Sequence, residues 1–368
     1  MKKYDYLIVG AGLFGAVFAH EARKAGKTCL VIDKRVHTGG NIYCQEIDHI
    51  QVHYYGAHIF HTHLKEVWNY VNRFVEFNRF VNSPLAFFEN KMYNLPFNMN
   101  TFNQLWGVIT PEEAKARIAE QCRKYADLEP ANLEEQALKL CGEDIYRIFI
   151  KGYTEKQWGR AASELPAFII KRLPVRFTYD NNYFSDPYQG IPVGGYNVLI
   201  GGLLRDTEVR LNTDYFENRD YFDQLAAKIL FTGCIDEFFG FEFGPLEYRS
   251  LKFEHEQLPI DNYQGNAVVN YNERAIPYTR IIEHKHFEFG QQPTTVITRE
   301  YPQVFMPGKE PYYPINDAAN TAKLNKYKEK AQLYPHILMG GRLAQYAYFD
   351  MDDTVKAALD LAEKEFIR

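Results

Sequence analysis

Cysteine is scarce in this chain, and runs of basic residues are missing. The five cysteines are scattered over 368 residues, and no two of them form a Cys-x-x-Cys pair. We therefore expect neither a disulfide framework nor a metal site, but free thiols in a reducing, cytoplasmic compartment. Lysine and arginine number 42 against 47 aspartate and glutamate, which gives a formal net charge of −5. An acidic chain without a basic block is a poor candidate for binding nucleic acid.

Long apolar runs are missing as well. No segment approaches the roughly 18 uninterrupted apolar residues of a membrane span. The short apolar stretch near the N-terminus breaks at Gly10, so we expect neither a signal peptide nor membrane insertion. Aromatic residues, by contrast, make up 15% of the sequence. They serve either a thick core or a surface that stacks on flat ligands.

A dinucleotide-binding fingerprint lies within the first forty residues. A predicted strand is followed at once by Gly-x-Gly-x-x-Gly, a helix, and a second strand that ends on Asp33. Gly10 permits the tight turn, and Gly12 lets a pyrophosphate approach the backbone N–H groups at the helix N-terminus. Gly15 allows close packing of helix on strand. The Asp33 carboxylate would accept hydrogen bonds from ribose hydroxyls.

A second glycine turn favours FAD over NAD. Asp33 is followed by the Gly-Gly pair at 39–40, an arrangement that resembles the FAD-binding flavoproteins that include the amine oxidases. A mobile turn between strands is the alternative. A short strand over 337–339 and an amphipathic helix after Asp350 would return the chain to this sheet, with the helix N-terminus near the flavin.

A helical pattern and a pattern of antiparallel strands interrupt the dinucleotide unit. The expected fold class is α/β. A Rossmann-like FAD-binding domain would carry an inserted helical domain and an inserted antiparallel β-sheet domain. Helices are predicted from Pro111, from Asn132 and from Glu143, the last of them stopping at Gly152. A strand with alternating faces is predicted over 278–287. The predicted domains are a discontinuous FAD-binding domain (1–79, 190–245 and 311–368), a helical domain (102–160) and a sheet domain (80–101, 161–189 and 246–310).

Several segments combine histidine, aromatic and arginine side chains. His58 and His61 lie three residues apart, as packing residues or as part of an active site. The segment around Trp158 is either core or a stacking platform for a base. Arg172 and Arg280 stand in apolar surroundings, either as surface ion-pair residues or as phosphate ligands. The composite interpretation is a flavin enzyme whose site takes a phosphorylated substrate.

Together these segments resemble the bacterial UDP-galactopyranose mutase family along nearly the whole chain. The most specific stretches are 55–62, 82–85, 94–100, 152–159, 166–183 and 346–351. The resemblance implies an isomerase that interconverts UDP-galactopyranose and UDP-galactofuranose without net redox change. It implies that N5 of reduced FAD attacks the anomeric carbon and displaces UDP, after which the sugar ring opens and recloses. The competing interpretation is a net-redox FAD enzyme of the amine oxidase type.

The resemblance also implies residue roles and a setting. The catalytic group would be Arg172, Arg280 and His61, with the two arginines clamping the UDP phosphates. Substrate contacts would come from the same two arginines and from Asn82, Phe149, Tyr153, Thr154, Trp158, Tyr183, Asn270, Tyr313 and Tyr348. Cofactor contacts would come from Gly10, Gly12, Phe14, Gly15, Asp33, Lys34, Gly40, Asn41, His58, Ile59, Arg342, Asp350 and Met351. The region 176–186 would form part of a lid. A cytoplasmic homodimer that provides galactofuranose for cell-surface polysaccharide is implied too.

Overall fold

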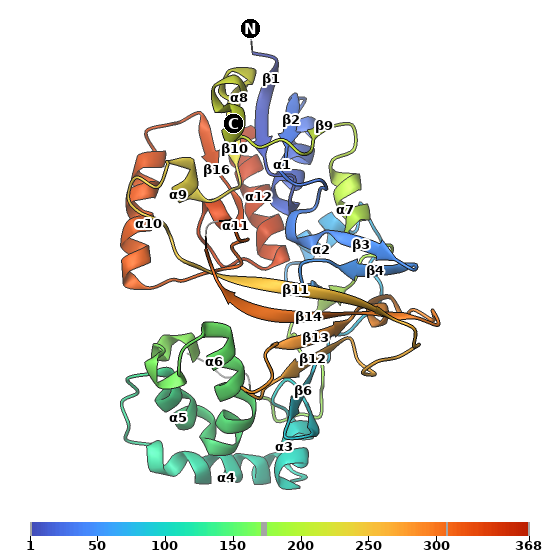
Figure 1. The fold of residues 1–368 in the computed structure, drawn as a ribbon, viewed down its shortest axis with the longest axis vertical. Helices are drawn as coiled ribbons and strands as arrows, with labels where there is room; N and C mark the ends of the chain where they lie inside the picture. The colour runs from blue at the N-terminus through green and yellow to red at the C-terminus, as the bar shows by residue number, and fades with distance from the viewer. Residues whose placement is uncertain (1, 171–174, 307, 367–368) are drawn as a thin grey trace.

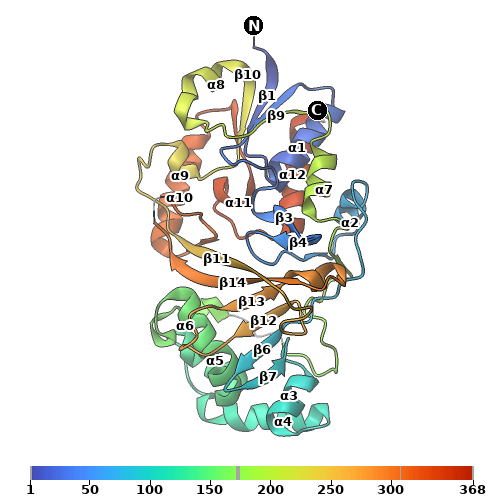
Figure 2. The same ribbon diagram turned by 45° about the vertical axis from the view of Figure 1, so that its right-hand side comes forward.

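The computed structural model describes residues 2–170, 175–306 and 308–366. A five-stranded sheet with its helices occupies one end of the molecule, and a helical part occupies the other (Figures 1 and 2). The long strands β11 (Tyr248–Leu258) and β14 (Thr295–Val304) run across the middle, between these two parts. No helix within the described ranges is long and apolar enough to cross a membrane.

The five-stranded sheet is the Rossmann-like unit that the glycine fingerprint predicts. Its order is β16 (Ile337–Met339), β10 (Ala226–Phe231), β1 (Tyr4–Val9), β2 (Cys29–Ile32) and β9 (Glu208–Arg210), and all neighbours are parallel. Helices α1 (Leu13–Lys24) and α12 (Met351–Phe366) share one apolar core beside it, in which Tyr6 packs against Phe18 and Phe366. The α/β fold class is thereby confirmed, and the C-terminal helix does return to the N-terminal sheet.

The second sheet has seven strands and is mainly antiparallel. Its order is β15 (Tyr313–Pro314), β11, β14, β13 (Arg280–Glu283), β12 (Val268–Tyr271), β6 (Leu85–Phe88) and β7 (Lys91–Asn94). The register places Arg280 between Asn270 on β12 and Glu300 on β14. Because β15 comes from a segment predicted for the FAD-binding domain, this sheet joins parts of the chain that are far apart. The exact division into domains stays a prediction.

The helical part follows the local signals in most places. It contains α3 (Met99–Trp106), α4 (Pro111–Cys122), α5 (Leu133–Ile145), the π-helix η3 (Tyr146–Lys151) and α6 (Gly152–Trp158). Thr110 caps α4 in a capping box with Glu113, and Asn132 caps α5, so the predicted starts at Pro111 and Asn132 are confirmed. The third predicted start, Glu143, follows a kink in α5 at Gly142, whose backbone is not helical.

Two predicted element ends are wrong. Gly152 does not stop a helix, because the chain continues helically through α6. Glycine is needed there for a different reason: a Cβ on Gly152 would lie 2.1 Å from the carbonyl oxygen of Asn272. The strand predicted to continue through Phe287 ends at Glu283, and His284–Glu288 forms a 3-10 helix.

The remaining elements connect these parts. They are η1 (Gly40–Ile42), β3 (Cys44–Ile47), β4 (Ile50–His53), β5 (Phe60–Thr62), α2 (Lys65–Val71), η2 (Arg123–Tyr125), η4 (Ala162–Glu164), η5 (Ala167–Ile170), β8 (Tyr188–Gly190), α7 (Tyr196–Leu203), η6 (Phe216–Asn218), α8 (Arg219–Leu225), α9 (Ile235–Phe238), α10 (Ala318–Ala331) and α11 (Gly341–Ala344). Among them, β5 and β8 form a two-stranded pair with His61 opposite Gln189.

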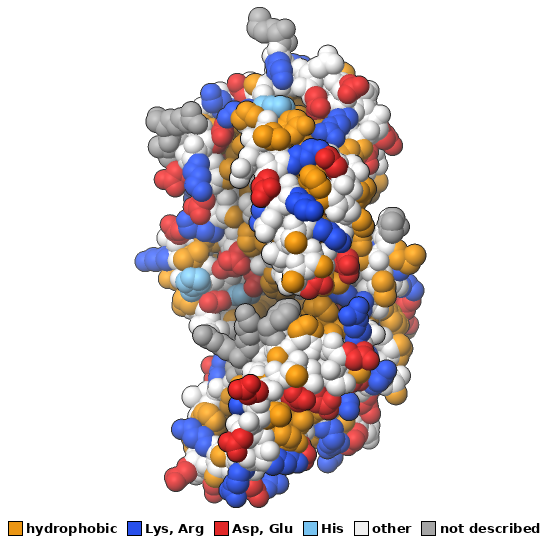
Figure 3. Space-filling model, turned by 90° about the vertical axis from the view of Figure 1, so that its left-hand side faces the viewer, with side chains coloured by type: hydrophobic (Ala, Val, Ile, Leu, Met, Phe, Trp, Pro, Cys, Tyr) orange, Lys and Arg blue, Asp and Glu red, His pale blue; other side chains and the backbone are white. Residues whose placement is uncertain are grey.

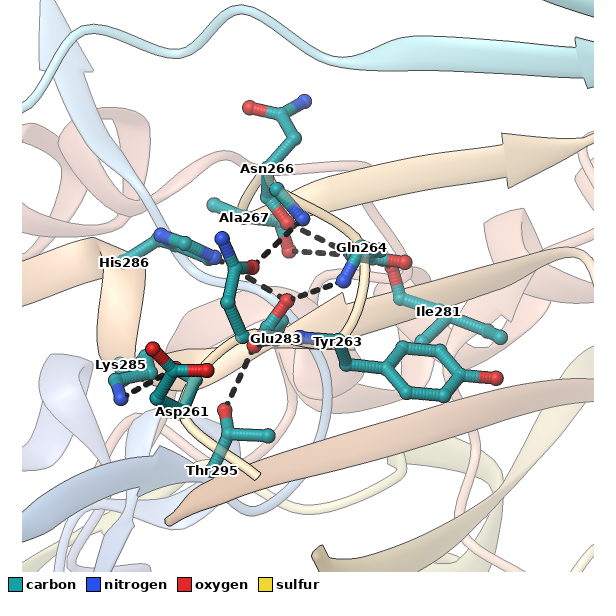
Figure 4. A network of polar contacts seen from close by, with 12 residues as sticks. Asp261, Tyr263, Gln264, Asn266, Ala267, Ile281, Glu283, Lys285, His286 and Thr295 are labelled. Atoms are coloured by element: carbon teal, nitrogen blue, oxygen red, sulfur yellow. Dashed lines mark hydrogen bonds and ion pairs between the residues drawn. The ribbon is translucent and has the colours of Figure 1, made fainter. Parts of the chain in front are cut away.

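A buried carboxylate, that of Glu283, lies at the end of β13 in a network of polar contacts (Figure 4). Glu283 is fully buried and accepts hydrogen bonds from the backbone N–H groups of Tyr263 and Gln264 and from the Thr295 hydroxyl. His286 lies 3.2 Å from the same carboxylate. Burial raises the pKa of Glu283, but these partners outweigh it and lower the pKa to about 2. The carboxylate therefore stabilises the fold in its charged form.

This network predicts a loss of stability in acid. Because its folded-state pKa is depressed from the usual 4.5, Glu283 contributes stability that is present above that value and is lost as the pH falls. We expect the free energy of unfolding to drop by about 2 kcal/mol more in the wild type than in Glu283→Gln between about pH 6 and about pH 3. Urea unfolding at each pH measures both proteins, and parallel pH curves would contradict the assignment.

Candidate functional site

A large cavity lined by described residues connects the dinucleotide sheet to the helical part. Its volume is about 1530 Å³, and its lining extends from Gly10 at the glycine turn to Trp158 at the end of α6. In the space-filling view the surface is hollowed between the upper and lower parts of the molecule (Figure 3). Ligand pockets usually measure about 300–1,000 Å³. This cavity therefore has room for a dinucleotide and a second ligand.

The glycine turn forms one end of the cavity, and its geometry requires glycine. Gly10 has φ +113°, and a Cβ on it would lie 2.0 Å from the hydroxyl oxygen of Thr232. A Cβ on Gly15 would lie 2.1 Å from the Gly10 carbonyl oxygen. Gly12 is the N-cap of α1 and offers no capping side chain, so the first N–H groups of this helix are free for an anion.

Asp33 and Arg35 flank this turn. The Asp33 carboxylate accepts hydrogen bonds from the backbone N–H groups of Ala11 (2.8 Å) and Arg35 (2.9 Å). Each of its oxygens retains capacity for a further donor such as a ribose hydroxyl. The Arg35 guanidinium pairs with Glu310 at 2.8 Å and donates to the side chain of Asn41 at 3.0 Å. Its Nη1 is buried and has no partner among the described residues.

These groups fit a dinucleotide cofactor such as FAD. Free helix N–H groups, Lys34 and the Arg35 Nη1 supply donors and positive charge for a pyrophosphate, while Asp33 supplies an acceptor. Every residue predicted for the cofactor lines the cavity. Arg35, Thr232 and Glu310 were not predicted, although Thr232 follows β10 at the carboxyl edge of the sheet, where ligands of such folds bind.

Both predicted histidines line the middle of the cavity. The Nδ1 of His58 donates to the Gly56 carbonyl at 2.8 Å, and burial lowers the pKa of this imidazole to about 4. The ring is therefore neutral at physiological pH. The backbone N–H of His58 donates to Nδ1 of His53 at 3.1 Å. In the described part of the chain, no three His, Cys, Asp or Glu side chains gather as metal ligands.

Arg280 on β13 is one of the cations that line the cavity beyond the glycine turn. Its Nη2 donates to the Tyr153 hydroxyl at 2.8 Å, and its Nε lies 3.4 Å from a carboxylate oxygen of Glu300. Burial lowers the pKa of the guanidinium, but Glu300, Tyr153 and Tyr313 together raise that pKa well above its usual value. Glu300 was not predicted, and only the pairing of β13 with β14 brings it opposite Arg280.

Phenol and amide groups surround this cation. The rings of Tyr313 and Tyr348 lie 17° from parallel with centroids 6.0 Å apart, and Tyr348 is 60% exposed. Tyr183 donates its backbone N–H to the carbonyl of Asn82 at 2.7 Å, and both residues line the cavity. The side-chain oxygen of Asn270 is buried without a partner in the described ranges. Together they offer several hydrogen bonds to a polar ligand.

The residues predicted for a base lie on or next to α6 and are only partly brought together. Trp158 lines the cavity, and Tyr153 reaches the site through Arg280. Phe149 is buried in the helical core against Tyr93 and Phe97. Among the described residues that line the cavity, Phe149, Tyr153 and Thr154 are all missing. The predicted Arg172 lies outside the described residues.

A lysine attaches α6 to the sheet. Lys156 donates to the carbonyl oxygens of Tyr271 (2.5 Å) and Tyr278 (2.8 Å), which flank the β12–β13 connection. Burial lowers the pKa of this ammonium to about 8. The attachment holds α6, which carries Tyr153 and Trp158, against the sheet that carries Arg280.

Comparison with known proteins gives two family matches. The UDP-galactopyranose mutase family matches residues 148–348, and the NAD(P)-binding Rossmann-like domain matches residues 8–74. A probable UDP-galactopyranose mutase of Klebsiella pneumoniae is 40% identical, over 99% of this chain and 95% of the relative. A dTDP-fucopyranose mutase of Escherichia coli is 39% identical, over 97% of both chains.

Solved structures show the same fold. A crystal structure of reduced UDP-galactopyranose mutase superposes with a TM-score of 0.73 at 14% identity, covering 98% of this chain and 95% of the other. A putrescine oxidase variant superposes with a TM-score of 0.56 at 12% identity, covering 99% of each chain.

The glycine turn gives a test of the cofactor cradle. Gly10→Ala would place a Cβ against Thr232 and displace the turn, so we expect FAD affinity to fall about tenfold or more. Gly26→Ala is the matched control. Gly26 also has a positive φ of +74°, but nothing lies within 4 Å of its added Cβ. Flavin absorbance after dialysis measures retention in both variants, and equal retention would contradict the role of the turn.

Proposed function

The chain belongs to the UDP-galactopyranose mutase family, and from this premise we propose that it interconverts UDP-galactopyranose and UDP-galactofuranose with FAD as its cofactor. The observation that carries the proposal is the cavity that joins a dinucleotide turn to a half-buried arginine with phenols around it. A sugar nucleotide requires both a place beside the flavin and a cation for its diphosphate.

The cofactor end would be held by the residues predicted for it. Backbone N–H groups at Gly12, together with Lys34 and Arg35, would bind the pyrophosphate, and Asp33 would bind the ribose. Gly40, Asn41, His58, Ile59, Arg342, Asp350 and Met351 complete the proposed lining. Bound in its reduced form, FAD would supply a nucleophile, N5, for the anomeric carbon with no net redox change.

The substrate end would orient the sugar nucleotide and stabilise the departing charge. The Arg280 guanidinium would pair with the UDP phosphates, with Arg172 as the proposed second clamp. The hydroxyls of Tyr183, Tyr313 and Tyr348 would donate to the same oxygens. Trp158 would stack on the uracil with Tyr153 and Thr154 nearby. Asn82 and Asn270 would hold sugar hydroxyls near His61.

A net-redox enzyme of the amine oxidase type is the alternative. It would share the dinucleotide sheet, as the putrescine oxidase fold illustrates. An amine substrate, however, has no use for the half-buried guanidinium of Arg280, whereas a diphosphate would pair with it. The family resemblance further leads us to propose a cytoplasmic homodimer.

The nearly equal identity to the dTDP-fucopyranose mutase raises a second candidate substrate. dTDP-fucopyranose lacks the C6 hydroxyl of galactose, carries a methyl group on the base and has no ribose 2′-hydroxyl. Because a site that hydrogen-bonds a hydroxyl rejects an analogue lacking it, one of the two substrates should dominate.

Direct assay tests the reaction. Purified protein with FAD and dithionite would receive UDP-galactofuranose or dTDP-fucofuranose in parallel, and chromatography would follow the products. We expect UDP-galactopyranose to form only with reduced flavin. Turnover of the dTDP-sugar alone would move the proposal to the second substrate. Oxidation of an amine, without isomerisation of either sugar nucleotide, would favour the alternative enzyme class.

Arg280 tests the phosphate site. Arg280→Ala should retain FAD and lose turnover by about 100-fold or more, because a positioned donor to developing charge is removed. The matched control is Arg299→Ala, one residue from Glu300 on β14, where the side chain pairs with Glu256 at 2.6 Å. Steady-state kinetics with a flavin content measurement compares the two. Near-normal activity of Arg280→Ala would remove this residue from the clamp.

A further inference from the structure

We propose that Asp186 is a positioning residue that fixes one tautomer of His61, so that the Nε2 of His61 carries protons for the sugar in the cavity. The proposal rests on the proposed function, because it assigns a proton carrier to that reaction. Asp186 belongs to the segment before β8 and does not line the cavity as the structure describes it.

The contact between the two side chains is short and defines the tautomer. Nδ1 of His61 lies 2.6 Å from Oδ2 of Asp186. A carboxylate can only accept a hydrogen bond, so Nδ1 must carry the proton and donate it. This leaves Nε2 as the ring nitrogen that is free to accept or to donate. A carboxylate on one imidazole nitrogen is a common device for orienting the other.

Two further contacts hold the ring in place. Phe184 stacks on His61 with centroids 3.7 Å apart and 16° between the planes. The pairing of β5 with β8 places the backbone of His61 opposite Gln189, three residues beyond Asp186. The side chains of His61 and Asp186 are only 17% and 25% exposed. The imidazole is therefore held in position and in plane as well as in tautomer.

The neighbouring charges leave His61 as the preferred partner of Asp186. His63 lies 3.9 Å from the other carboxylate oxygen, which is too far for a hydrogen bond, and its side chain is 72% exposed. Asp350, at the start of α12, lines the cavity near His61; burial raises the pKa of Asp350, and the charge of His61 lowers it. A second carboxylate near the ring would help to stabilise an imidazolium.

The ring contraction needs a group of this kind. When the pyranose opens, the C1–O5 bond breaks, its electron pair stays on O5, and O5 takes up one proton. When the furanose closes, the C1–O4 bond forms and the O4 hydroxyl releases one proton. As an imidazolium, His61 can give the first proton from Nε2 and recover the second there, so the ring returns to its charged starting state. The nucleophile that bound, reduced FAD would supply compensates C1 while it is bonded to neither ring oxygen. Asp186 keeps the Nδ1 proton in place and stabilises the charged ring.

Two variants of Asp186 separate positioning from folding. Asp186→Asn removes the charge and lets an amide N–H donate to Nδ1, which moves the ring proton to Nε2. We expect kcat to fall about tenfold or more, with KM for UDP-galactofuranose changed by less than about threefold. Asp186→Glu restores a carboxylate and should recover part of kcat. A purely structural role would instead raise KM and lower stability in both variants.

Long-range 1H–15N NMR spectra of histidine-labelled protein supply a readout independent of turnover. His61 is assigned by comparison with His61→Gln. We expect a protonated Nδ1 and an unprotonated Nε2 for the neutral ring in the wild type, and the reverse in Asp186→Asn. If the wild type has the opposite tautomer, or if Asp186→Asn keeps both the tautomer and kcat, the proposal is overturned.

Controls distinguish this outcome from failure of the proposed function. His63→Ala leaves the short contact intact, and Glu46→Gln disrupts a surface pair with His49 at 3.3 Å. Both should retain wild-type kcat and the wild-type tautomer of His61. If the wild type turns over no sugar nucleotide but shows the expected tautomer switch, the reaction assignment fails while the positioning contact stands. If the wild type turns over the sugar nucleotide but Asp186→Asn shows no tautomer switch, the reaction assignment stands and the positioning contact fails.

Discussion

A guanidinium group that is partly removed from water needs an opposite charge and hydrogen-bond partners close to it. The residues around Arg280 supply both. An unpaired buried cation would cost several kcal/mol, whereas Glu300 and the Tyr153 hydroxyl compensate this one. Glu300 is available because β14 pairs with β13, and Tyr153 is available because Lys156 holds α6 against the β12–β13 connection. The seven-stranded sheet and the helical part are thus joined at Arg280, the residue that we propose as the phosphate ligand.

The opposite end of the cavity is shaped by close backbone approach. Gly10 lies against Thr232, which follows β10, and Gly15 lies against the carbonyl of Gly10. Neither glycine has space for a Cβ. This contact directs the N-terminus of α1 into the cavity, beside Asp33 and Arg35. The partly exposed phenols, and the Asn270 oxygen that has no partner among the described residues, have unused hydrogen-bonding capacity. The protein therefore offers polar partners along the whole path between the proposed flavin and the proposed diphosphate.

Local sequence signals predicted most elements correctly, since their physical cause lies within a few residues. The capping box at Thr110 starts α4, and the Asn132 side chain caps α5. The failures occurred where a distant segment set the structure. Gly152 was interpreted as a helix stop, although it is small because the carbonyl of Asn272 approaches it from another part of the chain.

The sequence by itself determined the glycine turn, the acid that ends the second strand, and the family to which the chain belongs. Glycine spacing, capping side chains and apolar periodicity act over short distances along the chain and can be read from it. Only the tertiary structure decided which side chains act together. Glu300 faces Arg280 because of strand register, and Asp186 contacts His61 across 125 positions of sequence because β5 pairs with β8. Such contacts depend on how strands align, and strand alignment is set by the packing of the whole core and not by either residue's neighbours.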